Sequence, residues 1–187
     1  DLELFIRTKG ANLSFPSIIA FGKNSAIPHH QTGETKLKKG AFVLLDFGVN
    51  FQNYCSDMTR TVIFGKASQK QKHIYETVLE AQQKAIKLIN TGQRKASEID
   101  KAARDYVISK GYPNIPHSIG HGVGLDVHEH PHLSSTSKEI LKEGMVFSIE
   151  PGIYIPDFGG VRIEDLYVME KAGLRQLTTS PKNRIEV

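Results

Sequence analysis

The stretch Leu44–Arg60, LLDFGVNFQNYCSDMTR, has the pattern of a β-hairpin that carries two aspartates. An apolar run leads into Asp46, a polar turn follows, and Asp57 stands eleven residues further on. With a turn centred between Phe51 and Gln52, we expect the aspartates to lie directly opposite each other, their Cβ atoms about 4.5–5.5 Å apart. Because facing carboxylates repel each other, this stretch predicts a bound cation at the hairpin.

A second stretch, Gly144–Glu170, repeats the arrangement with glutamates. Glu150 and Glu164 stand fourteen residues apart, and a pairing centred on Asp157 in the PDFGG turn places them opposite each other. The chain between the hairpins includes a segment, residues 112–131, that is rich in glycine and histidine. Four carboxylates and an imidazole suit two divalent ions, because four negative charges balance two dications.

Such a ligand set indicates both the metal and the reaction. Oxygen-rich ligation with one histidine suits Mn²⁺, Fe²⁺, Co²⁺ or Zn²⁺ better than a soft-metal site would. Two such ions about 3.5–4 Å apart can share a water, lower its pKa and stabilise a tetrahedral intermediate. The sequence therefore predicts a hydrolase.

The remaining segments frame these hairpins. We expect a strand over residues 17–21, followed by a loop that contains His29 and His30. Ser68 begins a long helix with Gln71 in the capping-box position, and Ser97 begins a second helix that ends at Gly111. Both helices have one apolar side and are predicted to be structural. A last strand is expected over residues 176–179.

Composition narrows the functional class. The chain has 187 residues, enough for one sizeable core, and a net charge of +4. Its lysines are scattered without interleaved aromatics, so the basic balance indicates a solvated surface and no nucleic-acid partner. No apolar run approaches the roughly 18 residues of a membrane span. Cys55 is the only cysteine, which excludes a disulfide within the chain and fits a reducing, cytoplasmic compartment.

Five motifs, in order, resemble a known family. LLDFG, SDMTRT, GHGVGLDVHE, SIEPGIY and GVRIED are similar to the signatures of the M24 metallopeptidases, and GKNSAIPHH is similar to the Xaa-Pro branch, prolidase and aminopeptidase P. The resemblance implies an α+β pita-bread fold, a curved pseudo-twofold antiparallel sheet covered by helices. It implies one catalytic domain over residues 1–187, with an N-terminal domain and the first helix of the catalytic fold outside this sequence.

The resemblance also implies metal ligands. Asp46 would bind one metal, Asp57 and Glu164 would bridge two, and His121 would be the single imidazole ligand. Glu150 would be a ligand that also takes the proton of the bridging water. Two divalent ions are expected, with Mn²⁺ ranked before Co²⁺, Zn²⁺ and Fe²⁺.

Further residues gain roles from the same motifs. His29 would lie near the scissile bond, and His128 would hydrogen-bond the substrate carbonyl or the oxyanion. His117 would line the substrate pocket, and Arg162, two residues from Glu164 on a strand, would orient acidic ligands. Tyr154 would join Arg162 in this outer layer of the substrate site.

The implied activity is hydrolysis of the bond between an N-terminal residue and proline, by attack of a metal-bridging hydroxide. Small peptides with proline second would be the substrates of a homodimeric full-length protein. Dipeptidase and aminopeptidase action both stay open. A methionyl aminopeptidase and an inactive binding module on the same fold are the alternatives.

Overall fold

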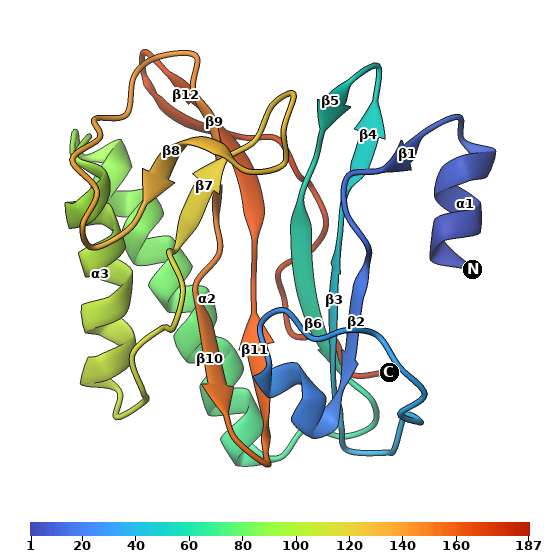
Figure 1. Cartoon of the computed structure of the whole chain (residues 1–187). Coiled ribbons are helices and arrows are strands. Elements are labelled where there is room, and N and C mark those ends of the chain that lie inside the picture. Colours follow the sequence, from blue (N-terminus) through green and yellow to red (C-terminus); the bar gives the residue numbers. More distant parts are fainter.

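The computed structural model describes residues 1–187 as layers of antiparallel strands with helices on one side. Helices α2 (Gln69–Asn90) and α3 (Ala96–Ser109) pack against each other and cover the strands, while the short α1 (Leu2–Thr8) lies at the opposite side of the molecule (Figure 1). A core of buried apolar residues joins the helices to the sheet. None of the helices is long and apolar enough to cross a membrane.

The two long helices begin and end close to the predicted positions. Ser68 caps α2, and its hydroxyl and the Gln71 side chain form both bonds of the predicted capping box. Helix α3 starts at Ala96, with Lys95 as its N-cap, so Ser97 lies inside the helix and does not begin it. The core-facing residues of both helices recur at helical spacing, which explains why they lie on the sheet.

The strands form four antiparallel groups. One sheet has the order β2 (Ile18–Phe21), β3 (Phe42–Phe47), β6 (Met58–Ile63). A small sheet has the order β1 (Asn12–Leu13), β4 (Val49–Phe51), β5 (Tyr54–Cys55). The largest has the order β13 (Gly173–Gln176), β12 (Asp165–Glu170), β9 (Val146–Ile149), β7 (Gly120–Gly122), β8 (Glu129–Leu133). The fourth pairs β10 (Gly152–Ile155) with β11 (Gly159–Arg162), and a 3₁₀ turn, η1 (Gly22–Ala26), follows β2.

The register of the first hairpin differs from the prediction. Gln52 and Asn53, with φ of 51° and 68°, form the two-residue turn, and positive φ at both positions is the type I′ pattern. The pairing is therefore centred one residue later than expected, and Asp46 lies opposite Thr59. The aspartates are offset by two residues, so the expectation that they face each other directly is wrong.

The register of the second hairpin is the predicted one. Gly152 pairs with Arg162 and Ile155 with Gly159, which centres the turn on Asp157. Ile149 pairs with Asp165 further along the same register, so Glu150 and Glu164 occupy opposed positions between the two paired segments. The tips of the two hairpins, β4–β5 and β10–β11, point to opposite ends of the molecule (Figure 1).

The glycine- and histidine-rich segment contains strands β7 and most of β8, which place His121 inside the largest sheet. One further expectation needs correction. The last strand, β13, ends at Gln176, where the predicted strand began. The turn that precedes it ends at Gly173, which pairs with Glu170 and whose φ of 135° belongs to the region that favours glycine, so this glycine was the signal for the true start of the strand.

Candidate metal centre

The five expected metal ligands come from different strands and meet in one cavity. Its volume is about 700 Å³. Asp46 lies in β3 and His121 in β7, whereas the other three carboxylates stand where strands are interrupted: Asp57 before β6, Glu150 after β9 and Glu164 before β12. At the two glutamates the backbone leaves the pairing of its own hairpin and bonds to other segments: Glu150 N–H donates to the Ile119 carbonyl at 2.7 Å and Glu164 N–H to the Thr59 carbonyl at 3.1 Å.

Three of these residues form a tight group. Asp57, His121 and Glu164 each offer one ligand atom, and these atoms all lie within 4.8 Å of one another. The three residues are only 5%, 6% and 2% exposed. A buried cluster with two carboxylates and an imidazole at this separation has the composition and size of a site for a divalent transition metal.

The imidazole of His121 is oriented for this purpose. Its Nδ1 lies 3.1 Å from the carbonyl oxygen of Gly122, and a carbonyl only accepts, so Nδ1 carries the proton. Nε2 then keeps its lone pair and lies 3.3 Å from Glu150 Oε1 and 3.7 Å from Asp57 Oδ2. Burial lowers the pKa of His121 to about 4, which keeps the ring neutral at physiological pH. A neutral ring fixed through its other nitrogen is the form that binds metal.

Unpaired carboxylate oxygens show that the site fits a cation. Asp46 Oδ1, Asp57 Oδ1 and Glu164 Oε1 are buried and have no hydrogen-bond partner in the protein. Such atoms are costly unless something positive binds them. The protein thus provides no hydrogen-bond donor for one oxygen of each of these three carboxylates, and a bound cation would take that place.

The same crowding shifts the pKa values of the acids. Burial, with the nearby charges of Glu164, Asp46 and Glu150, raises the pKa of Asp57 to about 11. Burial and the charge of Asp46 raise the pKa of Glu164 to about 7. The pKa of Glu150 is also raised, first by burial and then by Glu164. A divalent ion would reverse these shifts, because its charge favours the ionised carboxylates.

Arg162 supplies the positive charge that the protein itself places here. Its Nη2 donates to Asp46 Oδ2 at 2.6 Å, and its Nε lies 3.9 Å from Glu150 Oε2. The guanidinium is almost fully buried, and the charges around it raise its pKa further above the ordinary value, so it stays protonated. A guanidinium cannot bind a metal, so its role is to orient the carboxylates, as the two-residue spacing from Glu164 indicated.

Thr59 was not identified from the sequence. Its hydroxyl donates to Glu164 Oε2 at 2.7 Å and accepts from Arg162 Nε at 3.0 Å. It therefore leaves only the other oxygen of Glu164, Oε1, without a partner. The two-residue spacing from Asp57 gave a signal, because it puts Thr59 near the same face of the hairpin, but the partner strand could not be known from it.

Behind Arg162 a chain of hydrogen bonds reaches His117. Arg162 Nη1 donates to the Tyr154 hydroxyl at 3.0 Å, and that hydroxyl lies 2.8 Å from His117 Nε2. His117 Nδ1 donates to the Ser118 carbonyl at 2.7 Å, so Nε2 accepts the tyrosine proton. Burial lowers the pKa of His117 to about 4 and raises that of Tyr154 to about 12, which keeps both neutral.

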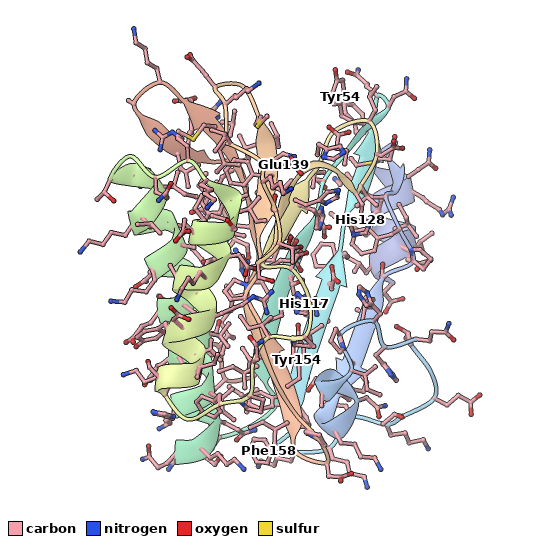
Figure 2. The ribbon with its side chains drawn as sticks, turned by 60° about the vertical axis from the view of Figure 1, so that its left-hand side comes forward. Tyr54, His117, His128, Glu139, Tyr154 and Phe158 are labelled. Carbon is pink, nitrogen blue, oxygen red and sulfur yellow. The ribbon has the colours of Figure 1, made fainter.

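The predicted substrate residues divide into two layers. His29, His117, His128 and Arg162 line the cavity, whereas Tyr154 lies outside its lining and acts on it through Arg162 and His117. His128 lies with its ring centroid 4.3 Å from that of His121. Figure 2 shows His128, His117 and Tyr154 one below another along the middle of the molecule, and Tyr54 and Phe158 at its opposite ends.

Two histidines that the motifs left without a role also belong to the cavity. His30 and His132 line it, and His132 pairs with His121 across β7 and β8. His130 points elsewhere, with its Nδ1 3.1 Å from Glu139 Oε1 at the surface. The exposed mouth of the cavity is therefore rich in imidazoles that can donate or accept hydrogen bonds.

Comparisons with known proteins agree with this geometry. The chain is 45% identical over 186 residues to an Xaa-Pro dipeptidase of Pyrococcus horikoshii, covering 98% of this chain and 53% of that protein. An X-Pro aminopeptidase of Thermotoga maritima superposes with a TM-score of 0.94 at 38% identity, over 100% of this chain and 53% of that one. The prolidase of Pyrococcus furiosus has a TM-score of 0.91 at 42% identity, over 96% of this chain and 54% of that one.

These matches confirm the predicted α+β pita-bread fold. The chain spans about half the length of the relatives that it matches. The family model for "Metallopeptidase family M24" matches residues 1–171. With both the fold and the acidic site in agreement, the chain belongs to metallopeptidase family M24.

Proposed function

We propose that this protein hydrolyses the peptide bond between an N-terminal residue and proline, using two divalent cations. The observation that carries the proposal is the buried group of Asp57, His121 and Glu164, whose ligand atoms lie within 4.8 Å of one another in a cavity that Asp46 and Glu150 also line. Asp46, Asp57 and Glu164 each keep one carboxylate oxygen without a hydrogen-bond partner there. Relatives named Xaa-Pro dipeptidase and X-Pro aminopeptidase support the substrate class.

The cations would be held by the five expected ligands: Asp46, Asp57, His121, Glu150 and Glu164. Asp57 and Glu164 would be shared between the two ions. Mn²⁺ is the first candidate, ahead of Co²⁺, Zn²⁺ and Fe²⁺, because the donor set is dominated by carboxylate oxygens. When bound, the pair of ions supplies an activated water as nucleophile and a positive charge for the reacting carbonyl.

The protein's own side chains would perform the remaining chemistry. Glu150, ionised when the cations are bound, would take the proton from the attacking water and return it to the leaving nitrogen as general base and acid. His128 donates a hydrogen bond to the oxygen that becomes negative. His29 lies beside the scissile bond, and the neutral His117, held by Tyr154, shapes the substrate pocket.

The proposal extends to the whole protein. Residues 1–187 would form a single catalytic domain, and the full-length protein would act as a cytoplasmic homodimer on small peptides. The unpaired Cys55 fits a reducing compartment. A cavity built from acidic groups, imidazoles and few apolar residues suits a short peptide with charged ends. We expect neither nucleic acid nor a membrane as a partner.

A peptide panel tests the proposal on the full-length protein with Mn²⁺ supplied. Xaa-Pro dipeptides, Xaa-Pro-Yaa tripeptides and Met-Ala-Yaa tripeptides are compared by release of the first residue. Cleavage of an Xaa-Pro bond supports the proposal, and the dipeptide-to-tripeptide ratio separates dipeptidase from aminopeptidase action. Preference for Met-Ala-Yaa identifies a methionyl aminopeptidase instead, and a folded protein that retains no metal and cleaves nothing identifies a binding module.

A further inference from the structure

We propose that Gln82, on helix α2, is a positioning residue that fixes the distance between the two backbone segments carrying Glu150 and Glu164. The inference rests on the proposed function, because it concerns the same metal centre. Gln82 belongs to a helix to which the sequence assigned only packing, and its side chain does not line the cavity.

The second hairpin is interrupted where its glutamates stand. Strands β9 and β12 pair up to Ile149 and Asp165, and strands β10 and β11 resume at Gly152 and Arg162. Both segments share one register, so the interruption lies between them and contains both glutamates. One long bond of 3.4 Å, from Ile163 N–H to the Pro151 carbonyl, crosses it. Regular pairing thus does little to hold the two glutamates at a fixed separation.

The amide of Gln82 bridges this interruption from behind. Its Nε2 lies 3.0 Å from the Ile149 carbonyl oxygen and 3.3 Å from the Ile163 carbonyl oxygen. These are the peptide groups directly before Glu150 and Glu164. Because peptide bonds are planar, fixing each carbonyl also fixes the direction in which the following residue leaves.

The chemistry of the amide determines its orientation. Nε2 also lies 3.1 Å from Asp165 Oδ2, so all three neighbours are acceptors and only the nitrogen end of the amide can face them. The amide nitrogen has two hydrogens, enough for the two carbonyls, because Asp165 has other partners. Arg60 Nη2 and the Thr178 hydroxyl donate to its Oδ1 at 2.6 and 2.7 Å, and Lys182 Nζ lies 3.3 Å from the Oδ2 that Gln82 contacts.

Packing alone does not explain a glutamine at this position. Gln82 is fully buried, and its Oε1 has no hydrogen-bond partner. A methionine of similar length would fill the space without burying an unpaired oxygen. The glutamine adds a donor group that links the backbone carbonyls directly before Glu150 and Glu164. Its loss is therefore expected to affect metal binding.

The test measures Mn²⁺ affinity of the full-length protein by calorimetry. Gln82→Met is expected to stay folded and to bind Mn²⁺ about tenfold more weakly, the lower end of the range for outer partners of metal ligands. Gln83→Met, an exposed neighbour on the same helix, controls for the substitution itself. Ile74→Val, in the fully buried part of α2, controls for a weakened core: it should lower the Tm and leave the affinity unchanged.

Equal Mn²⁺ affinity in Gln82→Met and the wild type overturns the inference and leaves the proposed function intact. A wild-type protein that binds none of Mn²⁺, Co²⁺, Zn²⁺ and Fe²⁺ overturns both. If Gln82→Met does not fold, NMR of the wild type with diamagnetic Zn²⁺ decides. The Gln82 side-chain amide signals should shift on Zn²⁺ binding, while those of Gln71, bonded to the Gly40 carbonyl, should not. Unmoved Gln82 signals reject the inference.

Discussion

The two hairpins carry the same kind of acidic pair in two different geometries. In the second hairpin the turn is centred on Asp157, and Glu150 and Glu164 occupy directly opposed positions. In the first, the turn at Gln52 and Asn53 offsets the aspartates by two residues and places Thr59 opposite Asp46. The offset replaces one carboxylate by a hydroxyl at the opposed position.

This difference shows how the hairpins are joined. Each one donates to a carboxylate of the other: Thr59 of the first hairpin bonds Glu164, and Arg162 of the second bonds Asp46. Arg162 also donates to Thr59, so the two donors touch. Had the first hairpin been symmetric, Asp57 would occupy the position of Thr59, and Glu164 would face another acid where it now meets a donor.

Removing the charge of Asp57 should have the largest effect. Asp57→Asn keeps the shape but removes one of the carboxylates proposed to be shared between two ions. We expect Mn²⁺ affinity and peptide cleavage to fall by more than about 100-fold, beyond the 10–100-fold typical of outer partners. Calorimetry and a peptide assay measure this, and Asp126→Asn, in an exposed loop, is the control.

Folding should not suffer in the same variant. The metal-free Asp57→Asn protein should have an equal or higher Tm than the metal-free wild type, because Asp57 must take up a proton to be buried among these acids and asparagine removes that cost. Unchanged turnover would contradict the role given to Asp57, and a collapsed Tm would show that the residue serves the fold.

Replacing the opposed hydroxyl should have the next largest effect. Thr59→Val keeps the branched shape but removes the donor to Glu164 and the acceptor for Arg162. We expect Mn²⁺ affinity to fall about tenfold, as for the loss of one outer hydrogen bond. Thr61→Val is the matched control: Thr61 lies on the same strand and bonds only the Arg162 backbone, at 3.0 and 3.2 Å. Equal losses in both variants would mean that the hairpin contact matters and the carboxylate bond does not.

The sequence predicted the second hairpin better than the first for a physical reason. PDFGG restricts the turn, since Asp157 and Gly159 both adopt positive φ, and few registers are compatible with that. In the first hairpin the symmetry of the two aspartates was a misleading guide. Asn53, which tolerates positive φ, was the better signal, because a two-residue hairpin turn requires it at both positions.

The hydrogen bonds between different elements, such as Thr59 to Glu164, could not be predicted from the sequence. Spacing within one strand shows which side chains share a face, and this was enough to relate Arg162 to Glu164. The spacing within one strand does not show which face of another hairpin packs against that strand. Thr59 and Gln82 act across elements that are far apart in sequence, so their partners become visible only in the folded structure.

The two hairpins should also differ in the pH dependence of stability, measured on metal-free protein with chelator. Asp57, with a pKa of about 11 when folded and an ordinary value of 3.8, is protonated in the folded state and ionised in the unfolded state between pH 7 and 9. Unfolding then releases a proton, so stability falls as pH rises, by about 1.4 kcal/mol per pH unit. Asp57→Asn should remove this contribution to the slope, whereas Glu150, whose pKa is also raised by burial, keeps its own.

The Glu164→Gln variant should act in a lower window. The pKa of Glu164 is about 7 when folded, from an ordinary 4.5, so its contribution to the fall in stability lies between these values. His117 and His121, with pKa values lowered to about 4, have the opposite effect in this pH range. Their contributions to the stability of the protein rise with pH up to about 6.5. The difference between Glu164→Gln and the wild type cancels the histidines. For Asp57→Asn, a slope above pH 7 identical to that of the wild type would refute the assignment to Asp57.

The smallest effect should come from the turn that sets the offset. Gln52 holds a positive φ of 51°, which costs an ordinary L-residue roughly 1–2 kcal/mol and asparagine less. Gln52→Asn should therefore raise the free energy of unfolding by about 0.5 kcal/mol without changing Mn²⁺ affinity, because the register stays the same. Urea unfolding measures the gain, and Gln69→Asn, exposed at the first position of α2, is the control. A turn centred between Phe51 and Gln52 would instead leave Asn53 outside the loop. A changed Mn²⁺ affinity in Gln52→Asn would therefore contradict the prediction. It would indicate that the register had moved with the turn, and that the turn residues Gln52 and Asn53 set the offset between Asp46 and Asp57.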